Sequence, residues 1–190
     1  MTVLRALDRV WAGLLWALMA LAALYIGFIM LAIVYVTIFR SAGWAYNQFV
    51  FTLIEYGFIY ILFLGSPWLV RTRGHVYIEL LTAAVPERSR AALSRGIAAL
   101  CAVICLVWAW YTLGIFVEQV EDPLAFDELR DDRGMRLWTI TVSYPVGFLF
   151  MAVEFLRYIF GREIMHSGDA GIANERLELE ETKRSLTEAR

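Results

Sequence analysis

Residues 10–39 have the sequence VWAGLLWALMALAALYIGFIMLAIVYVTIF, which contains no ionisable side chain other than tyrosine. A helix that crosses a membrane needs about 20 apolar residues, so this run of 30 residues predicts a transmembrane helix. At about 1.5 Å per residue the helix would be about 45 Å long, which exceeds a hydrocarbon core of about 30 Å, so we expect it to tilt or protrude. The apolar region of a cleavable signal peptide has only about 7–15 residues, which favours a helix that is retained.

Three further segments carry almost no charge. Residues 41–70 contain one charged side chain, Glu55, and residues 96–117 and 137–153 contain none. The sequence therefore predicts an all-α integral membrane protein with four transmembrane helices, at about 12–38, 47–65, 96–117 and 137–160. We expect residues 1–165 to form the transmembrane domain and residues 166–190 to form a polar cytoplasmic tail.

The composition of the whole chain agrees with a membrane protein. Hydrophobic residues make up 60% of the sequence and charged residues 19%, whereas soluble domains have about 45–50% and about 25%. A chain of this size cannot bury such an excess in one core, which excludes the common soluble enzymes, and the same numbers exclude disorder. A net charge of −2 provides no basic surface for nucleic acid.

The arginine distribution predicts the orientation, because cytoplasmic flanks of transmembrane helices are enriched in basic residues. Nine arginines flank the predicted helices on one side: Arg5, Arg9, Arg71, Arg73, Arg88, Arg90, Arg95, Arg157 and Arg162. Four flank them on the other side: Arg40, Arg130, Arg133 and Arg136. Both termini are therefore expected in the cytoplasm.

The cytoplasmic loop, residues 66–95, is expected to contain a short amphipathic helix. Pro67 is expected to end the second transmembrane helix, because proline lacks a backbone N–H and disfavours helix at the residue before it. Beyond it, His75 and Glu79 lie on one helical face. The apolar face carries Tyr77, Leu80, Leu81 and Ala84. The pattern predicts a short helix suited to the membrane surface or to a groove in a partner, and a solvated loop with one helical turn is the alternative.

The loop between the third and fourth helices is acidic. Its acids are Glu118, Glu121, Asp122, Asp127, Glu128, Asp131 and Asp132. They are interpreted either as a docking surface for a soluble partner, steered by charge, or as a hydrated loop, which the sequence alone favours.

Glu55 is the only acid deep within a predicted span. A charge in that position costs about 2.5–3.5 kcal/mol on insertion scales and usually faces a partner or water. Three interpretations stay open: a site that couples a cation or proton, a polar contact with another helix, or a hydrated acid near the outer interface. Glu154 and Arg157, three residues apart near the inner end of the fourth helix, are expected to pair at the interface.

The sequence offers few groups for catalysis or cofactor binding. Cys101 and Cys105 lie in an apolar run without further metal ligands nearby. Both histidines, His75 and His166, lie outside the predicted spans, which excludes a bis-histidine haem within the membrane. No nucleophile motif or glycine-rich phosphate loop is present. We therefore expect a non-enzymatic scaffold without a cofactor, which packs against a larger membrane partner.

Several short motifs resemble those of a known transporter family. They are Leu64-Gly65, the following Arg71 and Arg73, Gly74-His75-Val76 with Glu79-Leu80-Leu81, and Tyr144-Pro145-Val146-Gly147-Phe148 in the fourth helix. Four predicted spans and two cytoplasmic termini agree with the same family. Most of residues 1–165 therefore resembles the small membrane subunit, or DctQ-like small permease, of tripartite ATP-independent periplasmic (TRAP) transporters. Relatives often carry acids and an arginine near the start of the second helix, whereas residues 47–55 contain no arginine.

The resemblance implies a scaffold subunit in the bacterial inner membrane. In such systems a large membrane subunit carries the substrate and sodium sites, performs symport and moves as an elevator. A periplasmic binding protein delivers an organic acid to it. The resemblance suggests an interface with the large subunit or with lipids that comprises Glu55, Arg71, Arg73, His75 and Glu79. It suggests a docking loop for the binding protein that comprises Glu121, Asp122, Asp127, Glu128, Asp131 and Asp132. The alternative is a self-sufficient, small homo-oligomeric transporter that uses Glu55 as its coupling carboxylate.

Overall fold

The structure is a computed structural model that describes residues 2–73, 87–122, 125 and 136–161. Every regular element within these ranges is a helix: α1 (Thr2–Ser41), α2 (Gln48–Arg71), α4 (Glu87–Glu121), α6 (Leu137–Thr141) and α7 (Ser143–Phe160). Four helical segments are long and apolar enough to cross a membrane: Ala6–Ser41, Gln48–Arg71, Ala91–Glu121 and Leu137–Phe160. The predicted all-α class and the number of spans are therefore confirmed. The predicted interfacial helix and the 166–190 tail lie outside the described residues.

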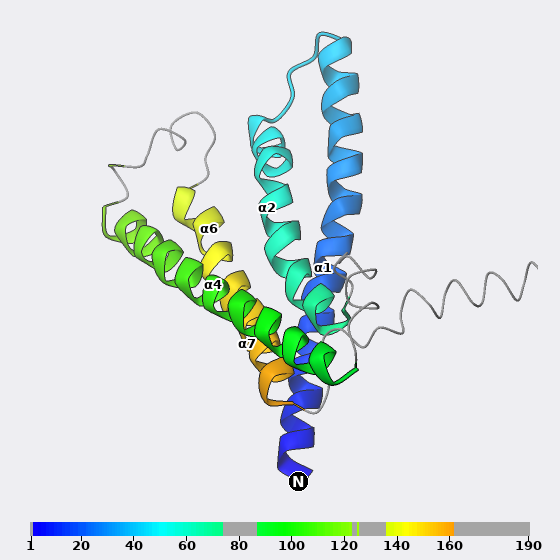
Figure 1. Cartoon of the computed structure of the whole chain (residues 1–190). Coiled ribbons are helices and arrows are strands. Elements are labelled where there is room, and N and C mark those ends of the chain that lie inside the picture. The colour runs from blue at the N-terminus through cyan, green and yellow to red at the C-terminus, as the bar shows by residue number, and fades with distance from the viewer. Residues whose placement is uncertain (1, 74–86, 123–124, 126–135, 162–190) are drawn as a thin grey trace, which may run out of the picture.

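The helices form two antiparallel hairpins (Figure 1). In one hairpin α1 packs along α2, and in the other α4 packs along α6 and α7. Contacts between α2 and α7 join the hairpins. Around the start of α1 and the ends of α2 and α7 the chain is most closely packed, whereas α1 and α4 diverge from there toward their other ends.

One stripe of α1 faces α2. Its buried residues are Leu15, Ala22, Ile29, Ala32 and Val36. Four of these positions are seven residues apart, and Ala32 lies three residues after Ile29. This is the spacing by which two helices keep one seam in contact along their length. Every residue of α1 between 10 and 39 lacks charge, so only this spacing, and not polarity, distinguishes the buried stripe from the exposed one.

Two differences from the predicted helices involve prolines. Pro67 does not end α2, as was predicted, because the helix continues to Arg71 with Pro67 buried inside it. Neighbouring helices make a proline inside a membrane helix tolerable. The predicted fourth helix is divided at Val142 into α6 and α7. Pro145 has no N–H to donate to the carbonyl of Thr141, which breaks the helical ladder there.

Small residues bring α4 and α7 together. On α4 they are Ser94, Ala98, Ala102, Cys105 and Thr112, all buried. Ala98, Ala102 and Cys105 form a core cluster with residues that include Ala152 and Phe155 of α7 and Val70 of α2. Because lipid tails are as apolar as leucine, helices associate in membranes through close packing, and small side chains permit it.

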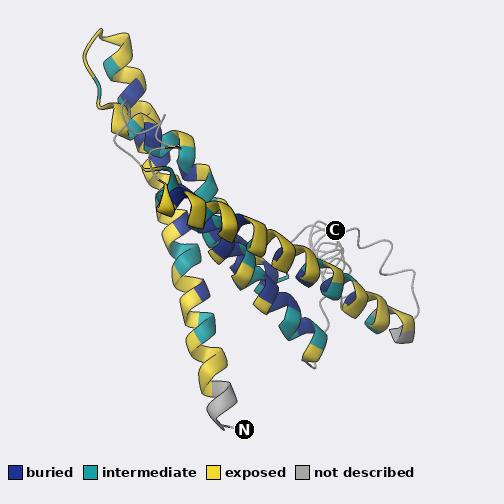
Figure 2. Ribbon diagram, turned by 90° about the vertical axis from the view of Figure 1, so that its left-hand side faces the viewer, coloured by how far each residue is buried: buried dark blue, intermediate teal, exposed yellow. Residues whose placement is uncertain are grey.

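Large apolar side chains lie on the outside. Figure 2 shows exposed residues along the outer surfaces of α1 and α4, with buried residues where the helices face one another. Exposed examples are Leu24 and Leu31 on α1 and Leu100, Val103 and Trp110 on α4. The molecule therefore presents its most apolar surfaces to its surroundings, as a membrane protein does.

We predict that a methyl group at Gly147 destabilises the fold. A Cβ there would lie 2.5 Å from Cδ1 and 2.7 Å from Cβ of Phe63, and Phe63 is itself packed edge-on against Tyr144 and Phe148. Gly147→Ala should lower the free energy of unfolding by about 1–3 kcal/mol, the usual cost of overpacking. Unfolding of the purified full chain in detergent, followed by circular dichroism, measures this.

Gly114→Ala is the matched control, because a Cβ at Gly114 meets nothing within 4 Å. This change should be neutral, or stabilising by up to about 1 kcal/mol through helix propensity. Equal effects of the two substitutions would contradict the packing of α2 on α7.

Candidate functional site

The residues that the sequence singled out are dispersed in the structure. Glu55 lies on α2 and is exposed, while Arg71 is the last residue of α2 and points into the protein. Glu121 ends α4, and Asp122 follows it with a side chain that accepts a hydrogen bond from the backbone N–H of Ala125 at 3.3 Å. Outside the described residues lie His75, Glu79, Asp127, Glu128, Asp131 and Asp132.

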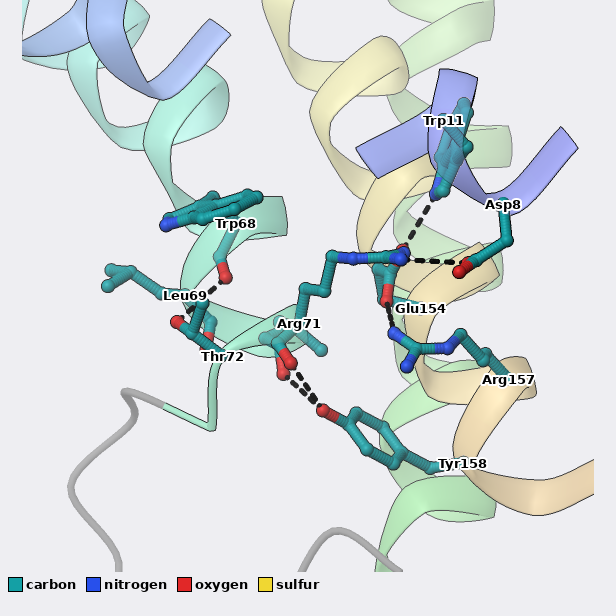
Figure 3. A network of polar contacts seen from close by, with 10 residues as sticks. Asp8, Trp11, Trp68, Leu69, Arg71, Thr72, Glu154, Arg157 and Tyr158 are labelled. Atoms are coloured by element: carbon teal, nitrogen blue, oxygen red, sulfur yellow. Dashed lines mark hydrogen bonds and ion pairs between the residues drawn. The ribbon is translucent and has the colours of Figure 1, made fainter. Parts of the chain in front are cut away.

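A buried carboxylate is the centre of the most extensive polar contact in the described chain (Figure 3). Glu154 of α7 is 0% exposed. Its Oε1 accepts a hydrogen bond from Nε1 of Trp11 at 2.7 Å and another from Nη1 of Arg71 at 2.9 Å. Its Oε2 accepts from Nη1 of Arg157 at 3.1 Å. Side chains of three helices, α1, α2 and α7, therefore converge on one carboxyl group.

Arg71 joins this carboxylate to a second one. Its Nη2 donates to Oδ1 of Asp8 on α1 at 2.8 Å, while Nη1 is engaged by Glu154. The side chain of Arg71 is 11% exposed and that of Asp8 is 52% exposed. We call Asp8, Trp11, Arg71, Glu154 and Arg157 the Glu154 cluster. With two acidic and two basic side chains its formal charge is zero, which reduces the cost of holding ions away from water.

Tyr158 extends the contact to the end of α2. Its hydroxyl donates to the backbone carbonyls of Val70 at 3.0 Å and Arg71 at 2.7 Å. The guanidinium groups of Arg73 and Arg157 lie 5.8 and 5.7 Å from its ring centroid, within the range of cation–π attraction. Arg73 has φ = 59°, a left-handed conformation that terminates helices and that glycine adopts more readily. The last turn of α2 is thus fixed to α7 through backbone and side chain together.

Two tyrosines make further links between helices. The hydroxyl of Tyr25 on α1 donates to the carbonyl of Leu53 on α2 at 3.0 Å, and that of Tyr60 on α2 donates to the carbonyl of Thr139 on α6 at 2.7 Å. The Tyr25 ring lies over Gly57, where a Cβ would approach it to 2.5 Å. These hydrogen bonds connect α1 to α2 and α2 to α6, away from the Glu154 cluster.

The structure confirms one prediction about acids and corrects another. Glu154 and Arg157 pair as their spacing predicted. The prediction that Glu154 lies at the interface is corrected, because the structure buries its side chain completely near the inner end of the span Leu137–Phe160, whereas Glu55, the acid singled out deep within a span, is exposed. The partners Asp8 and Trp11 were missed because they are far from Glu154 in sequence. An acid, a tryptophan and an arginine at the ends of three helices are a compatible set, but no local spacing connects them.

The chemistry of the cluster is that of a structural clamp. Both oxygens of Glu154 accept hydrogen bonds from the protein, and both carry a guanidinium partner. In the parts of the chain that the structure describes, no three His, Cys, Asp or Glu side chains are grouped so as to hold a metal ion. The arrangement fixes helices relative to one another.

This fold, four apolar helices held by an internal polar clamp, defines an integral membrane subunit. A sequence model of the family described as tripartite ATP-independent periplasmic transporters, DctQ component, matches residues 29–164. The chain belongs to this family and is a multi-pass component of a TRAP transporter of the inner membrane. Comparisons with curated proteins and with solved structures find no significant match. The matched region includes Arg71, Glu154 and Arg157, and begins after Asp8 and Trp11.

We predict that removing the charge of Glu154 destabilises the subunit. Glu154→Gln preserves the shape but leaves Arg71 and Arg157 without their shared anion. Because an uncompensated buried charge is costly, the free energy of unfolding should fall by about 3–5 kcal/mol. Chemical unfolding of the full chain in detergent measures the change.

The same substitution at the exposed Glu55 serves as the control. Glu55→Gln should change the free energy of unfolding by no more than about 0.5 kcal/mol, as surface substitutions usually do. If both variants unfolded alike, the Glu154 cluster would have no role as a clamp.

Proposed function

We propose that this chain is a non-catalytic scaffold subunit that anchors the large, elevator-type membrane subunit of its TRAP transporter. Membership in the DctQ family supports a partnership with a large membrane subunit and a periplasmic binding protein. The observation that carries the proposal is the Glu154 cluster, which clamps α1, α2 and α7. A moving transport domain needs a part that stays fixed relative to the bilayer, and a clamped bundle provides it.

The outer surfaces of the subunit suit an anchor. Both α1 and α4 expose large apolar side chains over most of their length. Displacing such a bundle along the membrane normal would expose apolar area to water, at about 25 cal/mol per Å². Burial in lipid and against the large subunit would therefore resist the forces that an elevator movement exerts on its frame.

The proposal includes an orientation with both termini in the cytoplasm. Arg71, Arg73 and Arg157 all lie where α2 and α7 end, so basic side chains gather at one end of the bundle. Cytoplasmic flanks are enriched in such residues. Glu121, the last residue of α4, and Asp122 lie at the opposite end of that helix and would face the periplasm, where an acidic loop can guide a binding protein. Sodium and an organic acid would be bound by the large subunit.

Reconstitution tests the scaffold function. The tagged chain should co-purify with the large subunit in a fixed ratio, and proteoliposomes should take up substrate only when the large subunit and the binding protein are also present. Glu55→Gln should leave uptake per complex within about twofold of wild type, because an exposed residue of a scaffold contributes little.

The competing function is that of a self-sufficient transporter that couples through Glu55. Transport by proteoliposomes that contain this chain alone, abolished by Glu55→Gln while the protein stays folded, would establish that function and reject the scaffold. An anchoring role would also be contradicted if the chain co-purified with the large subunit but uptake were the same with and without this chain.

A further inference from the structure

A groove runs between the beginning of α1 and the end of α7, with a volume of about 440 Å³. Its apolar walls are formed by Leu7, Val10, Leu14 and Val153, and the side of it that faces the protein interior includes Trp11 and the buried Glu154. Asp8 and Arg157 also line it. The groove therefore combines an exposed apolar surface with charged groups of both signs.

The two exposed charged residues lie toward one end of the groove, and most of its apolar lining extends beyond them along both helices. Along α1, Leu14 follows Asp8 by six residues, or about 9 Å of helix. The antiparallel α7 runs the other way, and Val153 precedes Arg157 by one turn. Consequently both charged side chains lie toward the ends of the helices, with Leu7 beside Asp8, and the remaining apolar lining of Val10, Leu14 and Val153 continues from there toward the middle of the bundle. An amphiphile with a compact polar head has this arrangement.

The exposed charges form a pair of opposite sign. The side chains of Asp8 and Arg157 are 52% and 31% exposed, so each can be reached from outside while it also takes part in the Glu154 cluster. A ligand with one positive and one negative group complements such a pair. An anionic ligand would be attracted by Arg157 and repelled by Asp8. A cationic ligand would be attracted by Asp8 and repelled by Arg157.

We propose that this groove binds one phospholipid with a zwitterionic headgroup that carries a primary ammonium, namely phosphatidylethanolamine. The phosphate pairs with Arg157, the ammonium donates to Asp8, and one acyl chain lies over Val10, Leu14 and Val153. A phosphatidylcholine headgroup has the same charges but no N–H to donate, and a phosphatidylglycerol headgroup has no positive charge. The bound lipid would cover the open side of the Glu154 cluster, a role that goes beyond anchoring the large subunit and does not depend on it.

Native mass spectrometry of the full-length chain tests the proposal. The delipidated protein in detergent is offered equal amounts of phosphatidylethanolamine, phosphatidylcholine and phosphatidylglycerol with identical acyl chains. We expect one phosphatidylethanolamine retained about tenfold better than the other two, as one charge-assisted hydrogen bond implies. Equal retention of the three lipids would overturn the proposal.

Two variants separate the acyl-chain site from the headgroup site. Val153→Trp places a larger side chain in the part of the groove that the acyl chain would occupy. It should reduce lipid retention about tenfold, since excluding a few methylene groups from an apolar surface has that effect. Val103→Trp makes the same change on the exposed face of α4 and should leave retention unchanged. Asp8→Asn keeps the side-chain size, and it should bring phosphatidylethanolamine down to the level of phosphatidylcholine.

A protein occupant would give a different result. In the complete transporter, a photoreactive group attached at Leu14→Cys should label lipid. Labelling of a helix of the large subunit in its place would show that a partner covers the groove, and would overturn the proposal. Lipid retention that is unchanged by Val153→Trp would also overturn the proposal.

Discussion

The buried carboxylate of Glu154 is the constraint on which the arrangement of the helices depends. An ion enclosed by apolar helices has to be matched by donors, and here the donors are Trp11 of α1, Arg71 of α2 and Arg157 of α7. Removal of any helix from the contact would leave a charge or a donor unsatisfied in a medium that cannot solvate it. Apolar contacts between the same helices could slide, because lipid and side chain are chemically alike, whereas this set of hydrogen bonds has one geometry.

Apolar packing and polar contacts contribute differently to the structure. The heptad-spaced seam of α1 and the small-residue seam of α4 let backbones approach closely, and the clamp sets the position of one hairpin on the other. Tyr158 strengthens the junction by binding two backbone carbonyls at the end of α2. These polar contacts lie inside the bundle. The broad apolar outer faces of α1 and α4 are therefore available for lipid and for a partner. The fixed frame that we propose for the transporter would require this combination.

Much of the fold could be predicted, and the errors have definite causes. Long uncharged runs revealed the four spans, because burying charge in lipid is costly whatever the tertiary structure. The helix ends were less accurate. Hydropathy marks where apolar character stops and not where the helix stops, so α4 begins at Glu87 and not near Gly96. Pro67 was given too much weight, since buried surroundings accommodate it, while Pro145 was overlooked as the cause of the break at Val142.

The sequence alone determined the class of protein, the four crossings, the family resemblance and the i, i+3 pairing of Glu154 with Arg157, since each depends on residues close together in the chain. Only the tertiary structure decided that Glu154 is buried and shared with Asp8, Trp11 and Arg71, and which face of each uniformly apolar helix lies inside. The physical reason is that Glu154 and Trp11 are separated by 143 residues. Within a run where every residue is apolar, composition carries no information about which side meets protein and which meets lipid.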